Sequence, residues 1–68
     1  GLMEIHLHGR DHDIKLVVES PETVRQVLVQ AGILPSTVLV SFENTILPHA
    51  TVLSQSVKLL VTTVSSGG

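Results

Sequence analysis

The predicted fold depends on residues 20–33, which read SPETVRQVLVQAGI. Within this stretch, apolar residues recur at the i, i+3, i+4 and i+7 positions that form one face of a helix: Val24, Val27, Leu28 and Ala31. The spacing predicts a single amphipathic helix over residues 21–31, whose apolar stripe packs against the rest of the domain.

Both ends of this helix carry sequence signals. Ser20 can cap the helix by accepting a hydrogen bond from a free amide of the first turn, and Pro21 at the first helical position has no amide to leave unsatisfied. Glu22 opposes the positive end of the helix dipole. Gly32 suits the left-handed residue that ends a helix, and Ile33 can pack back on the last turn. The sequence therefore predicts Ser20 as the N-cap.

Two alternating segments precede the helix. In residues 3–8 and 14–19, apolar side chains occupy every second position, which is the period of a half-buried β-strand. Residues 9–12 indicate a turn, because Gly9 allows a positive φ and Asp11 supports local hydrogen bonds. The two segments predict a hairpin.

Shorter segments follow the helix. Residues 38–42 are predicted to form a strand that is rich in β-branched and other apolar residues. The chain is predicted to turn at Glu43-Asn44. Residues 45–47 then form a short return strand, which Pro48 ends. Residues 49–56 are predicted to be a surface excursion with two side chains that turn inward, Val52 and Leu53.

The last segment, residues 57–64, is the longest and contains no breaker, which is typical of a central strand. The predicted order is strand, strand, helix, strand, short strand and strand. This order gives an α+β fold, a mixed sheet of four to five strands with one helix across one face. Because the helix joins the second and third strands, the arrangement resembles a β-grasp, and this is the fold we predict.

Alternation assigns the strand side chains to two faces. The face against the helix is predicted to receive Ile14, Leu16, Val18, Val38, Val40, Phe42, Val57, Leu59 and Val61. The other, open face is predicted to receive Val17, Leu39, Leu60 and Thr62, with His6 and His8.

Composition excludes several classes of protein. The 68 residues allow one small domain, and a hydrophobic content of 43% is enough to form a core. The absence of cysteine excludes disulfides, thiolate metal sites and thiol nucleophiles. A net charge of −2, without a basic stripe and with one aromatic residue, does not predict nucleic acid binding.

The ends of the chain complete the prediction of domain organisation. No segment supplies the ~20 apolar residues of a membrane span, and the amino terminus does not resemble a signal peptide. We therefore expect a soluble cytoplasmic protein, and we expect it to be a monomer. Gly1-Leu2 ahead of Met3 resemble a cloning remnant, so we expect one domain over residues 3–64 and a flexible tail over residues 65–68.

Histidines near the amino terminus raise the hypothesis of a metal site. His6 and His8 share one face of the first strand and His12 follows in the turn, but zinc needs three or four ligands, which His49 or Asp11 would have to complete. No second dense group of ligands occurs, so we interpret these histidines as solvated and predict no metal. A nucleophile elbow is also missing, and no catalytic residue is predicted.

The carboxyl terminus then carries a family resemblance. A domain of this size with a capped helix, with Leu53 five residues before Lys58 and with a terminal Gly67-Gly68 resembles the ubiquitin-like proteins. It is most similar to the MoaD/ThiS sulfur-carrier family and to the small archaeal modifier proteins (SAMP). Two turns, in which family members often have Asn-Gly and Gly-Asp, depart from the pattern and read Asn44-Thr45 and Gln55-Ser56.

The resemblance implies a carrier and not an enzyme. An E1-like adenylyltransferase would use ATP to adenylate the carboxylate of Gly68, which would then become a thiocarboxylate for a sulfur-accepting enzyme or an isopeptide bond to a lysine of a target protein. The narrow channel of such an enzyme would admit Gly67 and Gly68 because glycine has no side chain. The chain itself would bind no cofactor.

The resemblance also implies a docking patch on the open face, with Leu39 and Leu60 at its centre and with Val17 and Thr62 beside them. In the modifier role, Lys58 and Lys15 are candidates for joining one copy to another. The alternative is a non-catalytic β-grasp interaction module whose carboxyl terminus is never activated.

Overall fold

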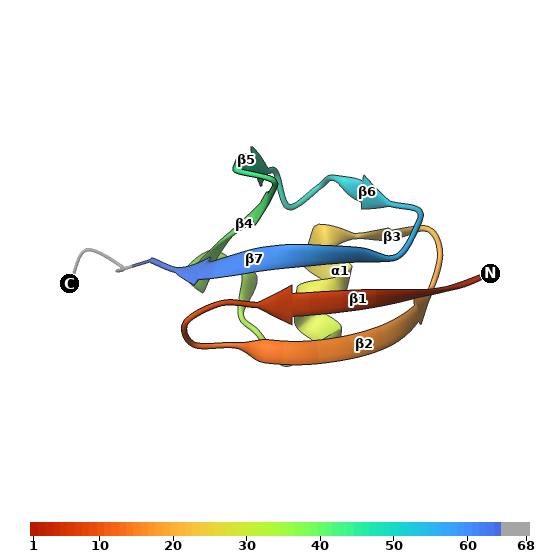
Figure 1. Ribbon diagram of the computed structural model, residues 1–68, viewed down its shortest axis with the longest axis horizontal. Helices are drawn as coiled ribbons and strands as arrows, with labels where there is room; N and C mark the ends of the chain where they lie inside the picture. The colour runs from red at the N-terminus through yellow and green to blue at the C-terminus, as the bar shows by residue number, and fades with distance from the viewer. Residues whose placement is uncertain (65–68) are drawn as a thin grey trace.

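The computed structural model describes residues 1–64, which form a mixed sheet with one helix across one face (Figure 1). Its elements in chain order are β1 (Leu2–His8), β2 (Asp13–Glu19), β3 (Glu22–Thr23), α1 (Val24–Gln30), the 3-10 helix η1 (Pro35–Thr37), β4 (Val38–Phe42), β5 (Thr45–Leu47), β6 (Val52–Leu53) and β7 (Val57–Thr63).

The five-stranded sheet has the order β2-β1-β7-β4-β5, and β3 pairs with β6 in a separate two-stranded sheet. The last strand, β7, lies in the middle, parallel to β1 and antiparallel to β4. The predicted α+β fold with a β-grasp arrangement is therefore confirmed, as is the central place of the final strand.

The core lies between the sheet and α1. Its most completely buried side chains come from β1, α1, β4 and β7: Ile5, Leu7, Leu28, Leu59, Val24, Val27, Val40 and Val61. No polar or charged side chain is buried among the described residues, so the core is held together by apolar packing.

Phe42 differs from the prediction that it packs under the helix. Of the nine side chains assigned to that face, the other eight are buried or packed against the core, whereas Phe42 is 39% exposed. It shares a face with Val40 but is the last residue of β4. There it borders a hollow whose lining comes from β4, β5, β7 and the segment around β6, with no α1 residue.

The helix begins three residues later than predicted, at Val24. Its N-cap is Thr23, whose hydroxyl accepts a hydrogen bond from the Gln26 amide at 3.1 Å, while the Gln26 side-chain oxygen accepts one from the Thr23 amide at 2.8 Å. β3 also pairs with β6, which keeps the chain extended up to the cap. The prediction of Ser20 as the N-cap is therefore wrong.

The carboxyl end of the helix agrees with the sequence signal. Gly32 has a φ of 79°, the left-handed conformation that glycine tolerates best. Its amide donates to the Val29 carbonyl at 3.0 Å, and the Ile33 amide donates to the Leu28 carbonyl at 2.9 Å. These two bonds form a Schellman motif, and Ile33 is buried as expected.

Two short segments differ in detail from the prediction. β1 begins at Leu2, one residue before the predicted strand, and Leu2 lies opposite Glu19. Of the two side chains expected to turn inward after β5, Leu53 is buried but Val52 is 60% exposed. Successive residues of a strand point to opposite sides, so β6 can bury only one of the two.

Gly9 is required for a reason other than the predicted positive φ. Among residues 1–64, the left-handed region is adopted only by Gly32, Glu43 and Asn44. A Cβ at Gly9 would instead overlap the backbone carbonyl oxygen of Val61. Glycine at this position therefore lets the turn between β1 and β2 lie directly against the backbone of β7.

Candidate functional site

The candidate site is the face of the sheet opposite α1, which we call the open face. Strand pairing aligns its side chains in rows that cross the sheet. One row crosses all five strands: Asp13, His8, Leu60, Ser41 and Ile46. A second row crosses β2, β1 and β7: Lys15, His6 and Lys58. A third joins β7 and β4: Thr62 and Leu39.

Three of the four predicted docking residues lie together in these rows. Leu39 is directly opposite Thr62, and Leu60 is two residues before Thr62 on the same face of β7. Leu39 is 43% and Leu60 is 39% exposed, so both present apolar surface to solvent.

Val17 occupies the same face but not the same place. It lies on β2 opposite Glu4, whereas Leu60 lies at the level of His8. Four residues along a strand separate these two levels, which is about 13 Å. The row that contains His6 lies between them, so the structure does not bring Val17 next to the other three.

Ile46 is an apolar member that the sequence analysis missed. It is 61% exposed on β5 and faces Ser41, the neighbour of Leu60 in the same row. The sequence contained a signal for this position. A two-residue turn at Glu43-Asn44 fixes which residues of β4 and β5 pair, and the pairing fixes the face on which each β5 side chain lies. We call the set Leu39, Ile46, Leu60 and Thr62 the open-face patch.

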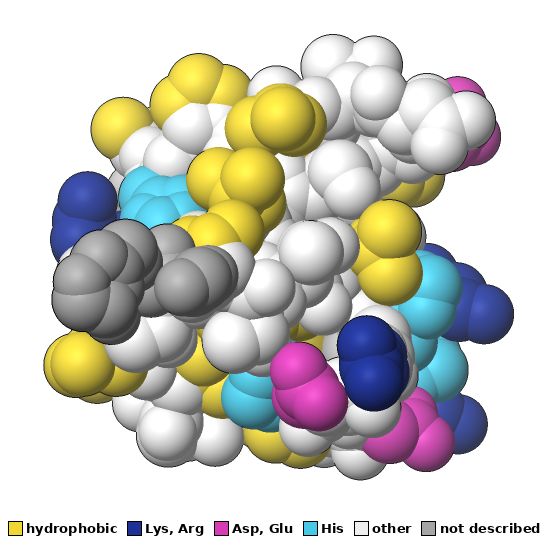
Figure 2. Space-filling model, turned by 90° about the vertical axis from the view of Figure 1, so that its left-hand side faces the viewer, with side chains coloured by type: hydrophobic (Ala, Val, Ile, Leu, Met, Phe, Trp, Pro, Cys, Tyr) yellow, Lys and Arg dark blue, Asp and Glu magenta, His cyan; other side chains and the backbone are white. Residues whose placement is uncertain are grey.

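Histidines and lysines lie on the same face as this patch, and His8 and Lys58 are next to it. In Figure 2, which views the end of the molecule where β7 finishes, histidine and basic side chains gather along the right-hand edge beside an apolar one. The rings of His6 and His8 have centroids 5.7 Å apart. Both lysines of the sequence, Lys15 and Lys58, are exposed and lie in one row on either side of His6.

His6 also contacts a carboxylate on the neighbouring strand. Its Nε2 lies 2.6 Å from Oδ1 of Asp13. The hydrogen bond to His6 and then the charge of His6 lower the pKa of Asp13, desolvation opposes them, and Lys15 and His8 lower the pKa by smaller amounts. Because Asp13 is exposed, solvent screens this pair and its contribution to stability is small.

The predicted metal-ligand candidates do not come together. Within residues 1–64, no group of three or more histidine, aspartate or glutamate side chains is arranged to hold a metal ion. His49, one of the residues that would have had to complete such a site, lies elsewhere, since its carbonyl accepts a hydrogen bond from the Arg25 amide at 2.9 Å near the start of α1.

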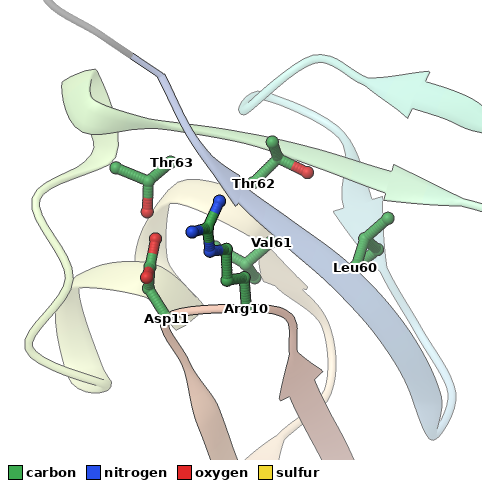
Figure 3. A pocket seen from close by; sticks show the side chains of 6 residues that line it. All are labelled: Arg10, Asp11, Leu60, Val61, Thr62 and Thr63. Atoms are coloured by element: carbon green, nitrogen blue, oxygen red, sulfur yellow. The ribbon is translucent and has the colours of Figure 1, made fainter.

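A hollow of about 380 Å³ lies where β7 ends (Figure 3). It is lined by Arg10 and Asp11 of the β1–β2 turn together with residues 60–63 of β7. Beyond β7, the Val64 amide donates to the Thr37 carbonyl at 2.9 Å. The chain is therefore held on one side by β4 up to Thr63 and by the last residue of η1 at Val64. The hollow, with both charged and apolar lining residues, lies at the same end of β7.

Gly67 and Gly68, the predicted site of activation, lie outside the described residues. The structure places the start of their segment, because Val64 directly follows the central strand. In the described part of the chain, no helix is long and apolar enough to cross a membrane.

Comparisons with known proteins agree with this architecture. No family model matches the chain, and no curated protein matches it either. Among solved structures, a ubiquitin from Caldiarchaeum subterraneum is similar over 100% of both chains, with a TM-score of 0.73 and 19% sequence identity. A chain in the crystal structure of a pParkin-pUb-UbcH7 complex is similar over 94% of this chain and 23% of its own length, with a TM-score of 0.68 and 20% identity. The chain therefore has the ubiquitin-like β-grasp fold.

Proposed function

We propose that the chain is a ubiquitin-like carrier or modifier that acts through the carboxylate of Gly68. The observation that carries this proposal is the place of the final four residues, Ser65-Ser66-Gly67-Gly68, directly after the central strand of a β-grasp domain. The last residue held by a backbone hydrogen bond in the described chain is Val64. Four residues beyond it extend at most ~14 Å, enough to carry a carboxylate into the active site of a partner.

The proposed chemistry takes place in an E1-like adenylyltransferase. A carboxylate oxygen of Gly68 attacks the α-phosphorus of ATP, pyrophosphate leaves, and an acyl-adenylate forms. Sulfur at the sulfide oxidation level or a lysine amine then attacks the acyl carbon and loses a proton, the bond to the phosphate oxygen breaks, and AMP leaves. The product is a thiocarboxylate, as in the MoaD/ThiS sulfur carriers, or an isopeptide bond, as in a SAMP-type modifier. The chain contributes no catalytic group and needs no bound cofactor.

The open-face patch has a role in this scheme as the docking surface. Its apolar side chains are exposed without being needed for the core, and it lies near the end of β7 from which the final residues continue. A partner that covers Leu39 and Leu60 would therefore hold the domain beside its own active site.

The second candidate function is a non-catalytic interaction module. It is favoured by the same patch, which can bind a protein without any reaction at the carboxyl terminus. The two candidates differ in one respect only, namely whether ATP changes Gly68 covalently.

Intact mass spectrometry distinguishes them. The chain is incubated with an E1-like enzyme of the same organism, ATP and a sulfur source, and a matched chain that ends at Ser66 serves as the control. Replacement of oxygen by sulfur adds about 16 Da, which we expect only for the chain that ends at Gly68. Adenylation without sulfur uptake, with stable conjugates of higher mass, would indicate a modifier. No mass change with an enzyme active on another substrate would overturn the proposal and leave the interaction module.

A further inference from the structure

The two edge strands of the five-stranded sheet differ in how well they are protected against pairing with another chain. β5 has three residues, and Pro48 follows it directly. β2 has seven residues without proline or glycine, and within residues 1–64 its one strand partner is β1 (Figure 1). The outer side of such a strand presents backbone amide and carbonyl groups to which a further strand can bind. β2 is therefore the edge at which the sheet can be extended.

The side chains of β2 also leave apolar surface at this edge. Val17 is 63% exposed on the open face, and it lies apart from the open-face patch. On the side of α1, Val18 is buried, whereas Leu16 is only partly buried against the core. A strand added beside β2 would cover the exposed parts of Val17 and Leu16.

The charges of β2 favour one register for pairing with a second copy of the chain. A two-fold axis perpendicular to the sheet pairs β2 with its own copy in the antiparallel direction and centres the pairing on one residue. With the centre at Val17, Lys15 lies opposite Glu19 of the second copy, and Glu19 lies opposite its Lys15. Val17 then lies opposite itself, and Leu16 lies opposite Val18 on the side of α1. Opposite charges and apolar side chains directly across from each other stabilise strand pairing.

Two neighbouring registers place like charges together. With the centre at Leu16, Asp13 lies opposite Glu19 on both sides of the axis. With the centre at Lys15, this lysine lies opposite itself. Like charges directly opposite each other destabilise a strand pair, so both registers are disfavoured.

The remaining registers pair fewer residues. Centres at Ile14 or Val18 leave only three residues of each strand paired, because β2 begins at Asp13 and ends at Glu19. The register centred on Ile14 also requires the carboxylate of Asp13, which already contacts His6 at 2.6 Å. The register centred on Val17 is thus the one that pairs opposite charges over a longer stretch.

Both charged groups of this register are accessible. Lys15 is exposed and forms no salt bridge within residues 1–64. The side chain of Glu19 is 73% exposed, and its Oε2 lies 3.5 Å from the amino-terminal ammonium group. Solvent screens a pair this exposed, so the contact does not prevent Glu19 from facing a lysine.

We propose that two copies of the chain associate by antiparallel pairing of their β2 strands, centred on Val17. Residues 15–19 pair in each copy, and the two five-stranded sheets join into one. An interface of this size is small, so the expected monomer is in equilibrium with a weak dimer. Because the two-fold axis is perpendicular to the sheet, both open-face patches lie on the same side. A binding partner with two sites would therefore gain avidity.

A disulfide tests the pairing, because the chain contains no cysteine. Val17→Cys places two thiols opposite each other across the axis, with Cα atoms about 5 Å apart, which a disulfide can span. A glutathione redox buffer supplies the oxidant, and non-reducing electrophoresis measures the disulfide-linked dimer. Val29→Cys on α1 is the control, because Val29 is similarly exposed at 61%. We expect several-fold more dimer from Val17→Cys than from Val29→Cys.

Charge variants of the Val17→Cys chain test the register. Lys15→Glu places two pairs of carboxylates across the axis, and we expect it to lower the amount of dimer several-fold. Addition of Glu19→Lys restores opposite charges and should restore the dimer. Lys58→Glu makes the same change of net charge on the central strand and should leave the amount of dimer unchanged.

Three results would overturn the inference: equal dimer formation by the two cysteine variants, equal losses for Lys15→Glu and Lys58→Glu, or an exchange of charges that does not restore the dimer. Circular dichroism of the reduced variants establishes that each is folded. In the unmodified chain, the amide chemical shifts of residues 15–19 should change with concentration, and constant shifts would also reject the pairing. No activating enzyme is involved, so these results are independent of the test at Gly68.

Discussion

The two faces of the sheet carry similar apolar side chains in opposite environments. On the face covered by α1, Leu59 and Val61 are at most 1% exposed, whereas the next residues on the same strand, Leu60 and Thr62, are exposed on the open face. Histidines and both lysines also occur on the open face. One strand thus contributes every second residue to the core and leaves the residues between them exposed.

Replacement of Leu59 should have the largest effect on this comparison, with Leu60 as the matched control. Leu59 is 0% and Leu60 is 39% exposed. We expect Leu59→Ala to lower the free energy of unfolding by about 3 kcal/mol, from lost apolar burial and the remaining cavity. Leu60→Ala should cost less than about 1 kcal/mol. Urea unfolding followed by far-UV circular dichroism measures both free energies. Equal losses would show that the two faces contribute equally to stability.

A substitution at Gly9 tests the contact between the first turn and the central strand. A Cβ at this position would overlap the Val61 carbonyl oxygen, so the turn must move away from β7. We expect Gly9→Ala to lower the free energy of unfolding by about 2 kcal/mol, as other overpacked sites do. Asp11→Ala in the same turn is the control and should change little. Unchanged urea unfolding of the Gly9 variant would contradict the close approach.

Helix capping distinguishes the observed start of the covering helix from the predicted one. Thr23 exchanges two hydrogen bonds with Gln26, whereas Ser20 lies outside the helix. We expect Thr23→Ala to cost about 1 kcal/mol and Ser20→Ala to cost much less. A larger loss of unfolding free energy for Ser20→Ala than for Thr23→Ala, measured by urea unfolding, would indicate that the helix begins at residue 21.

A gain in stability is expected at the β4–β5 turn, away from both faces. Glu43 and Asn44 have φ values of 48° and 68°, so both positions suit glycine better than other residues. We expect Asn44→Gly to raise the free energy of unfolding by about 0.5 kcal/mol. Thr45→Gly, one residue further into the strand, should lower it instead. A lower free energy of unfolding for Asn44→Gly would show that residue 44 does not adopt the left-handed conformation.

The smallest effect concerns the contact between His6 and Asp13 on the open face. The pKa of Asp13 is lowered first by the hydrogen bond to His6, so the folded state binds this proton less readily than the unfolded chain. The pair therefore adds stability above the ordinary pKa of aspartate and loses it as the pH falls through the lower folded value. In an NMR titration, His6→Gln should move the Asp13 midpoint upward and His12→Gln should not. A midpoint that stays in place in both variants would exclude the contact.

Local signals predicted most of the fold. Alternation gave the faces of β1, β4 and β7, and Gly32 gave the end of α1, because each depends on neighbours in sequence. The start of the helix was missed because two signals competed. Ser20-Pro21 fits a cap, but Thr23 and Gln26 fit one as well, and pairing of β3 with the distant β6 decides between them.

The candidate site was less predictable, because its parts meet through pairing of distant strands. The sequence places Val17 and Leu60 on one face, but only the parallel register of β1 and β7 shows that they are far apart. The same register brings Lys58 into one row with Lys15. Exposure of Phe42 likewise depends on where the helix ends over the sheet, which alternation does not encode.

The parallel pairing of β1 and β7 has a mechanical consequence. The two strands run side by side in the same direction, and the ends of the described chain lie at opposite ends of the molecule (Figure 1). A force that pulls Gly1 and Val64 apart therefore acts along the strands, and it loads the hydrogen bonds between them together and not one after another. A domain of this geometry should resist being drawn through a narrow pore from its carboxyl end.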